Sequence, residues 1–317
     1  MRNSFGLIVL GLALLINGCG GGGGGSSSSG STTTSPSIFT TGKTMAYLRH
    51  LLFDGSYLYV VDSESLNTPN TYGHLRQFSS TTGSFVTTYE NSSTNFEDVY
   101  SVTKFNSDLL ISGSYVSGGG TIAQGVIKIT NNSGSYSYTT FYSSSDSLYG
   151  LVADANYLYV ANQSTNSIVV CNAANSCGTS ITGTWVRPTG LAYDGSSYIY
   201  VTDYSPTSNK GLYKIKISDQ SVTSVSSSLF NKPNGVAVYS STGDVYVVNT
   251  GTSDTDSSVL KISSDGATIS TFLDGSLTSS MLCKPVGAAI SGNYLYISNG
   301  TCSANSAYAN AVIKISL

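Results

Sequence analysis

The amino-acid sequence predicts an all-β fold, namely a six-bladed β-propeller in which each blade is a four-stranded antiparallel sheet. Six segments share one pattern: an apolar strand, a turn rich in Gly, Asp or Asn, and a second strand of the form apolar-Tyr-Val-x-Asp/Asn. A third strand follows in every repeat, and a fourth follows in most. Four strands per period of about 40–50 residues are typical of propeller blades. The second strands are centred 41 to 51 residues apart, at Tyr59, Leu110, Tyr159, Tyr200, Tyr246 and Tyr296.

Residues 1–18 precede the repeats and have the features of a targeting signal. A short, weakly basic start is followed by an almost unbroken apolar run, Phe5 to Ile16, and then by Asn17-Gly18-Cys19. The run is too short to span a bilayer. The segment resembles a bacterial lipoprotein signal with its lipobox, which implies removal of residues 1–18 and lipidation of Cys19. We therefore expect a protein anchored in the bacterial cell envelope, at the periplasmic face of the outer membrane or at the cell surface.

Residues 19–36 follow the signal, and residues 20–35 contain only Gly, Ser and Thr. Such a segment cannot bury enough apolar surface to offset the entropy of ordering it, so we expect a flexible linker. Its root-mean-square span is roughly 20–25 Å. The folded domain then comprises residues 37–317.

The last repeat ends after its third strand, at Ile315-Ser316-Leu317. One strand-like piece, Ser37 to Thr41, lies before the first repeat and has no partner there. If it completes the last blade, the ring closes with six blades and every strand is used. The sequence therefore predicts that Ser37 to Thr41 is the outer strand of the sixth blade.

Four cysteines remain after Cys19 is assigned to lipidation, an even number as expected for disulfides in an oxidising compartment. Cys171 and Cys177 flank one predicted hairpin turn, and Cys283 and Cys302 fall in two loops of one repeat. We predict these two pairs as disulfides. Their spacing lacks the C-x-x-C pattern and nearby His of a zinc site, which disfavours metal binding.

Composition limits the possible partners. Charged residues make up 10% of the chain and the net charge is −3. The sequence contains no basic or arginine-rich segment, which argues against nucleic acid as a partner. We expect a monomer that meets the membrane through its lipid anchor and binds a protein or a small polar ligand.

A second motif precedes the Tyr-Val strand in the later repeats. Pro-x-Gly-apolar-Ala begins at Pro188, Pro233 and Pro285, and the full pattern resembles the NHL repeat and, less closely, the YVTN repeat. The resemblance covers nearly the whole folded part and implies a propeller, but these propellers host enzymes, receptors and scaffolds. The first two repeats depart from it, with Arg49-His50 and Tyr100-Ser101 in place of x-Gly.

The motif places candidate site residues at one mouth of the propeller. The first strand of a blade lines the axis and the second runs antiparallel to it, so the x residues and the ends of the second strands meet there. We name the x residues the axial positions: Arg49, Tyr100, Tyr149, Thr189, Asn234 and Val286. The second strands end at Asp62, Gly113, Asn162, Asp203, Asn249 and Asn299.

We predict a ligand site at this mouth, because pockets of this kind are the usual binding sites of propellers. Its predicted residues are Arg49, Tyr100, Tyr149, Asp203 and Asn234. A cation beside two aromatic rings suits an anionic or aromatic ligand. Two alternatives remain open: the strand-end Asp and Asn residues can bond the backbone of adjacent turns, and Arg49 can pair with Asp62.

The sequence favours a binding module without a catalytic residue or cofactor. One alternative is a metal-dependent hydrolase or lyase, because gluconolactonase-type propellers are similar in architecture and hold a divalent metal on the axis. Asn234 matches such a ligand, but Thr189 and Val286 do not, and His50 and His74 have no clear catalytic partner. A further alternative is a structural protein of the cell surface.

Overall fold

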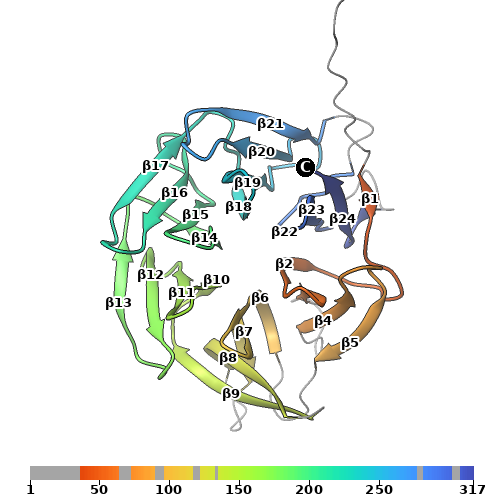
Figure 1. Ribbon diagram of the computed structural model, residues 1–317, viewed down its shortest axis with the longest axis vertical. Coiled ribbons are helices and arrows are strands. Elements are labelled where there is room, and N and C mark those ends of the chain that lie inside the picture. Colours follow the sequence, from red (N-terminus) through yellow and green to blue (C-terminus); the bar gives the residue numbers. More distant parts are fainter. Residues whose placement is uncertain are drawn as a thin grey trace, which may run out of the picture. The chain divides into compact units, whose positions relative to one another are not determined.

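In the described part of the chain, twenty-four β-strands form six four-stranded sheets arranged around a common axis (Figure 1). The computed structural model describes residues 36–63, 73–89, 96–116, 122–132, 135–276, 281–301 and 308–317. Within these ranges no helix is long and apolar enough to cross a membrane. The predicted six-bladed propeller of antiparallel blades is confirmed.

Five blades are built from strands that follow one another in sequence, the sixth combines β22 to β24 with β1, and the innermost strand of each blade lies nearest the axis (Figure 1). The first three blades consist of β2 (Leu48–Phe53), β3 (Tyr57–Asp62), β4 (His74–Ser79) and β5 (Phe85–Tyr89); β6 (Phe96–Phe105), β7 (Asp108–Val116), β8 (Ile122–Asn132) and β9 (Ser135–Ser144); and β10 (Leu148–Ala153), β11 (Tyr157–Asn162), β12 (Ser167–Asn172) and β13 (Cys177–Thr182). The other three consist of β14 (Pro188–Tyr193), β15 (Tyr198–Asp203), β16 (Lys210–Lys216) and β17 (Val222–Ser226); β18 (Pro233–Tyr239), β19 (Asp244–Asn249), β20 (Ser258–Ile262) and β21 (Ile269–Asp274); and β22 (Gly287–Ser291), β23 (Tyr294–Ser298), β24 (Val312–Ser316) and β1 (Ser37–Ile38).

The N-terminal strand closes the ring as predicted, although it is shorter than expected. In β1, Ser37 pairs with Lys314 and Ile38 pairs with Ile313. The chain then turns toward the first blade, where Thr41 forms a parallel bridge with Ser84. The turn places the buried Phe39 ring 4.9 Å from the Tyr296 ring of the sixth blade. The segment therefore joins the last blade to the first.

The hydrophobic core is divided among the blade boundaries. Six clusters of buried side chains each combine residues from two neighbouring blades, including the pair of the sixth and first blades. This division follows from strand alternation, because each sheet presents one set of apolar side chains to either neighbour. The sheets therefore pack face to face around the ring.

The glycine of the Pro-x-Gly motif is required by close packing at the axis. A Cβ atom at Gly190, Gly235 or Gly287 of the motif, or at Gly150 in the equivalent position of the third blade, would lie 2.1 to 2.6 Å from the backbone carbonyl oxygen of the axial residue in the next blade. The motif thus fixes how closely neighbouring blades approach.

Side-chain hydrogen bonds cross every blade boundary near the axis. At three boundaries a hydroxyl of the second strand donates to the carbonyl of the next axial residue: Ser112 to Tyr149, Thr202 to Asn234 and Ser298 to Arg49. At the other three, the residue after the second strand donates instead: Ser63 to the Asp98 carboxylate, Gln163 to the Pro188 carbonyl and Thr250 to the Pro285 carbonyl. These bonds between neighbouring blades therefore fix the segments that carry the axial side chains.

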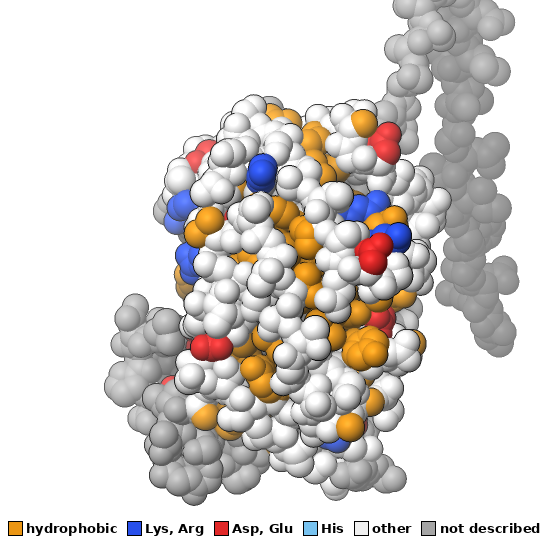
Figure 2. Space-filling view, turned by 90° about the vertical axis from the view of Figure 1, so that its left-hand side faces the viewer, with side chains coloured by type: hydrophobic (Ala, Val, Ile, Leu, Met, Phe, Trp, Pro, Cys, Tyr) orange, Lys and Arg blue, Asp and Glu red, His pale blue; other side chains and the backbone are white. Residues whose placement is uncertain are grey.

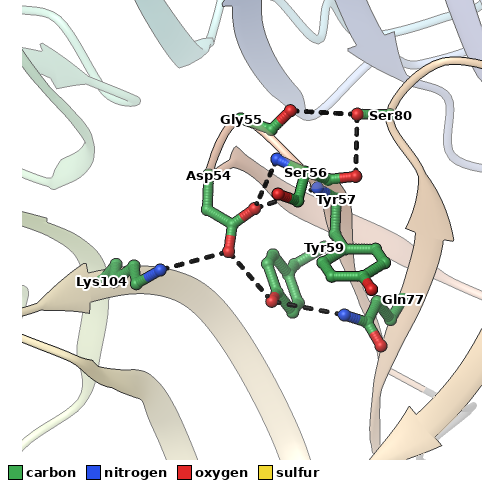
Figure 3. Close-up of polar contacts among 8 residues, drawn as sticks. All are labelled: Asp54, Gly55, Ser56, Tyr57, Tyr59, Gln77, Ser80 and Lys104. Atoms are coloured by element: carbon green, nitrogen blue, oxygen red, sulfur yellow. Dashed lines mark hydrogen bonds and ion pairs between the residues drawn. The ribbon is translucent and has the colours of Figure 1, made fainter.

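The opposite end of the propeller is tied by a recurring aspartate turn, drawn for the first blade in Figure 3. The Asp54 carboxylate accepts hydrogen bonds from the backbone of Ser56 and Tyr57 and from the Tyr59 hydroxyl. Lys104 of the next blade lies 3.3 Å from the same carboxylate. Burial disfavours the charged carboxylate, but these donors outweigh it and lower the pKa of Asp54. The turn therefore links the inner hairpin to its neighbour.

The Cys171–Cys177 disulfide is present and joins β12 to β13. Cys283 is also disulfide-bonded, while Cys302 lies outside the described residues, so its pairing stays a prediction. Cys19 and the linker also lie outside them. On the side of the propeller that carries β13 and β17, charges are isolated and hydrophobic groups form narrow seams between uncharged polar ones (Figure 2).

Candidate ligand-binding site

A cavity of about 270 Å³ opens where the first strands begin and the second strands end. Five of the six axial positions line it, so the mouth predicted from the motif exists. The lining consists of Tyr47, Arg49, Tyr149, Gln163, Arg187, Thr189, Tyr204, Lys232, Asn234, Thr250, Gly251, Thr252, Lys284, Val286, Gly300 and Thr301.

Three of the five predicted site residues, Arg49, Tyr149 and Asn234, line this cavity. Tyr100 is outside the lining but stacks on Tyr149, with ring centroids 4.1 Å apart and an interplanar angle of 21°. Asp203 is fully buried and is not among the lining residues. The structure thus brings four of the five together.

Arg49 is held among aromatic rings. Its guanidinium carbon lies 5.1 Å from the centre of the Tyr47 ring and 5.3 Å from that of Tyr100. One terminal nitrogen lies 3.7 Å from the Asp98 carboxylate. The alternative pairing with Asp62 is not found, because Asp62 bonds Arg76 at 2.6 Å. Arg49 is therefore positioned by rings on two sides and retains donors for a ligand.

Asp98 organises the aromatic side of the mouth. Its buried carboxylate accepts hydrogen bonds from the Tyr100 hydroxyl at 2.6 Å and from the Ser63 hydroxyl. Burial, together with the bond to Asp98, raises the pKa of the Tyr100 hydroxyl well above its usual range. Tyr100 therefore stays neutral, and its ring stacks on the ring of Tyr149.

Asp203 shapes the loop that enters the fourth blade. Its carboxylate accepts hydrogen bonds from the backbone nitrogens of Val186 and Arg187, both at 2.8 Å, and of Ser205 at 3.1 Å. Its oxygens are thus occupied by backbone groups, in agreement with the structural alternative. The carboxylate contributes to the mouth indirectly, by holding the backbone of Arg187.

Three cations that line the cavity were missed in the sequence. Arg187, Lys232 and Lys284 each precede the proline of a Pro-x-Gly motif, in the fourth, fifth and sixth blades. With Arg49 they give four positive charges, and no Asp or Glu lines the cavity within the part of the chain that the structure describes. Among the described residues, none of these three forms an ion pair. The recurring Arg/Lys-Pro dipeptide was the signal that could have revealed them.

Lys232 and Lys284 have an uncommon backbone conformation. Their φ angles are 52° and 43°, in the left-handed region that favours Gly and Asn. Lysine has no short polar side chain that would stabilise this conformation locally, and the following proline favours extended backbone. Such outliers persist where the surrounding structure imposes them and cluster at functional sites. Both lysines lie at the rim of the mouth.

The rim between the fifth and sixth blades is stiffened by Asp256. Its carboxylate accepts hydrogen bonds from the backbone of Thr252 and Ser253 and from the Asn231 amide. Burial opposes ionisation, but the hydroxyl and backbone donors outweigh it and hold the pKa of Asp256 well below its usual range. The loop that contributes Gly251 and Thr252 to the lining is therefore braced by a charged group.

His50 occupies the place of the motif glycine in the first blade. Its imidazole lies beside the Asn234 side chain of the fifth blade and 3.4 Å from the Ser101 hydroxyl. Burial and the nearby charge of Arg49 lower the pKa of His50 to about 4, although hydrogen bonding to Asn234 opposes this. Asn234 Oδ1 accepts no bond of normal geometry, so its contact with His50 is loose. The ring is neutral at pH 7.

The strand-end Asp and Asn side chains are structural. For example, Asn249 and Asn299 are fully buried and bond backbone groups of the loops that enter their own blades. In the described part of the chain, no group of three or more His, Cys, Asp or Glu side chains could hold a metal ion. With Asp203 engaged by backbone, the described mouth residues do not fit a divalent metal centre.

Solved structures share this fold over 89% of the chain. An auxiliary nutrient binding protein from Bacteroides ovatus matches with a TM-score of 0.64 and 13% identity, over 76% of its own chain. Regucalcin, a calcium-binding protein from Agrobacterium tumefaciens, matches with 0.63 and 12% over 93% of its chain. Virginiamycin B lyase from Staphylococcus aureus matches with 0.56 and 10% over 98% of its chain. No protein-family model and no curated protein sequence match the chain.

These identities show a common fold and nothing finer. The chain is a six-bladed propeller structurally similar to binding proteins and to lyases. Because one fold serves many functions, the function has to be argued from the mouth itself.

Proposed function

We propose that this protein is a lipid-anchored binding module of the bacterial cell envelope whose propeller mouth binds a small anionic ligand. One observation carries the proposal: among the described residues, four cations and no carboxylate line a single cavity of about 270 Å³. The cations are Arg49, Arg187, Lys232 and Lys284. Concentrated positive charge in a concave site attracts anions and raises their local concentration.

The electrostatics of the mouth contrast with those of the whole chain. The protein has a net charge of −3 and only 14 Lys and Arg residues, and four of these face one cavity. Arg187 also lies 4.8 Å above the Tyr204 ring, and its Nε atom donates to Gln163 at 3.0 Å. These contacts orient the guanidinium without neutralising it. An anionic ligand would supply the missing counter-charge.

Binding without catalysis is the better supported function. The alternative of a hydrolase or lyase draws on the shared fold with virginiamycin B lyase. Within the described residues, however, the cavity lining contains no His, Asp, Glu or Cys that could act as a general base, nucleophile or metal ligand. His50 contacts the Asn234 side chain but is not itself among the lining residues. The likeness to a nutrient binding protein agrees with a binding role.

The envelope location rests on the sequence. Lipidation at Cys19 would tether the propeller through residues 20–35, whose span of roughly 20–25 Å holds the fold away from the bilayer. A tethered binding module needs only this reach to sample ligands near the membrane.

The binding proposal can be tested by isothermal titration calorimetry on the purified full-length protein. We expect small carboxylate and phosphate anions to bind, neutral and cationic analogues to bind far more weakly, and affinity to fall with added salt. Arg49→Ala together with Arg187→Ala should weaken anion binding more than tenfold. The matched control is Lys104→Ala with Lys216→Ala, which removes two charges that pair with Asp54 and Asp219 outside the mouth. Equal binding of neutral and anionic compounds would overturn the proposal.

A further inference from the structure

We infer that the ligand of the mouth is an acidic sugar, namely a monosaccharide or disaccharide that carries a carboxylate. This inference rests on the proposed function and names the ligand class. Three properties of the mouth support it: a cluster of cations, an aromatic face, and hydrogen-bond acceptors.

The mouth combines cations with aromatic rings. The cations Arg187, Lys232, Lys284 and Arg49 come from the fourth, fifth, sixth and first blades, and the stacked tyrosines Tyr100 and Tyr149 come from the second and third. The Tyr47 and Tyr204 rings lie beneath Arg49 and Arg187 and are used in holding them, and one face of the Tyr149 ring is covered by Tyr100, so the other face of Tyr149 is the one that can meet a ligand. A ligand that uses both the cations and this face carries an anionic group and a ring.

The neutral groups of the lining require hydrogen-bond donors from the ligand. The Thr189 hydroxyl donates to the Arg187 carbonyl at 3.0 Å, and the Thr250 hydroxyl donates to the Pro285 carbonyl at 2.7 Å. Each oxygen also accepts one bond, Thr189 from the Gln163 amide at 3.1 Å and Thr250 from the Asn234 amide at 3.4 Å, so one lone pair of each hydroxyl remains for a donor from the ligand. The buried Oδ1 atom of Asn234 is a third acceptor, and its contact with His50 is loose. An unsatisfied buried acceptor is costly, so a donor from the ligand stabilises the complex.

Hydroxyl groups supply these donors, whereas simple carboxylates and sulfate have none. The buried Nε atom of Arg49 lacks a partner as well and needs an acceptor, which a hydroxyl or carboxylate oxygen can provide. A ring with several hydroxyls and one carboxylate therefore meets the cations, the acceptors and the aromatic face together. Size agrees, because about 270 Å³ is at the small end for ligand pockets.

The backbone of Lys232 and Lys284 indicates that their charge is needed. Glycine would adopt φ angles of 52° and 43° without strain, yet lysine occupies both positions. Replacing both by Gly should leave the propeller at least as stable as before and should weaken binding. A purely structural role of these lysines predicts the opposite result for stability.

The test is calorimetric titration of the purified full-length protein with named probes. They are D-galacturonate and D-glucuronate, the neutral sugars D-galactose and D-glucose, and tricarballylate, an anion without hydroxyl groups. We expect at least one uronate to bind more than tenfold tighter than both its neutral counterpart and tricarballylate. Tyr149→Ala should weaken uronate binding about tenfold and leave tricarballylate binding unchanged. The control is Tyr157→Ala, which removes an exposed tyrosine at the end of the same blade that lies away from the mouth, and it should change the binding of neither probe.

The double variant Lys232→Gly with Lys284→Gly should weaken the uronate and tricarballylate alike, and thermal unfolding should show no loss of stability. Lys104→Ala with Lys216→Ala is the charge-matched control. If tricarballylate binds as tightly as the uronates and Tyr149→Ala has no effect, the sugar inference is wrong while anion binding stands. If no anion binds, both the inference and the proposed function are wrong.

Discussion

Replacing His50 by Gln should remove a specific acid sensitivity of the folded protein. In the folded state the pKa of His50 is lowered from 6.5 to about 4 by burial and by Arg49, so the fold favours the neutral ring. The unfolded chain therefore binds more protons between these two pH values. The contribution of His50 to stability is complete above about pH 6.5 and is lost as the pH falls toward 4.

The size of the effect follows from the two pKa values. Each pH unit between the two pKa values lowers the free energy of unfolding by about 1.4 kcal/mol. Protonation of His50 therefore accounts for a loss of at most about 3 kcal/mol at pH 4 and about 2 kcal/mol at pH 5. The imidazole is desolvated, although the residue as a whole keeps some exposure to solvent, so these values are upper limits. The aspartates with lowered pKa, such as Asp54 and Asp194, lose their contribution only below about pH 4, outside this window.

Urea unfolding at pH 7.5 and pH 5.0 would measure the effect in the wild type and in His50→Gln. We expect the wild type to lose up to about 2 kcal/mol more than the variant between the two pH values. The comparison uses the difference between pH values, so a general cost of the substitution cancels. An equal loss in both proteins would refute the reasoning and place the imidazole in an environment open to water.

Four further outcomes are expected. Cys19→Ser should move the protein from the membrane fraction to the soluble fraction, and an unchanged distribution would contradict lipidation. Deletion of residues 36–44 should lower the melting temperature sharply or cause aggregation, because it removes the closing strand and the buried Phe39, whereas deletion of 20–34 should do neither; equal tolerance of both would argue against closure. Peptide mapping without reductant should find Cys171–Cys177 and Cys283–Cys302, and crossed pairs would disprove the assignment. Asp203→Ala should lower the free energy of unfolding by about 2–3 kcal/mol, since three backbone donors lose their acceptor, and unchanged unfolding would show that they find other partners.

The number of blades could be predicted because the repeat is regular and leaves one strand over. The length of the closing strand could not. Ser37 to Thr41 consists mostly of residue types that favour strands, but only tertiary packing shows that the Phe39 ring enters the boundary between the last and first blades. That contact turns the chain, so that Thr41 pairs with the first blade. Local sequence carries no sign of a partner more than 200 residues away.

The position of the mouth was predictable, whereas its charge was not. The motif fixes which residue of each blade reaches the axis, and five of the six axial residues line the cavity. Arg187, Lys232 and Lys284 are 45 and 52 residues apart, so they form no basic run in the sequence. They become one cluster only through the ring. The role of Asp203 could not be predicted either, because a carboxylate at the end of a strand can bind a ligand or accept hydrogen bonds from the backbone.

At the mouth, backbone groups hold the blades together, whereas the axial side chains are available to a ligand. At the axis the fold uses backbone groups: motif glycines allow the close approach of neighbouring blades, and the carbonyls of the axial residues accept the hydroxyl bonds that join them. The axial side chains take no part in these contacts, so substitutions there should change the ligand without unfolding the ring. The left-handed backbone at Lys232 and Lys284 fits the same division, because under the proposed function these lysines are kept for the charge that they bring to the mouth. A propeller of this kind can therefore change its specificity at six positions while its blades stay the same.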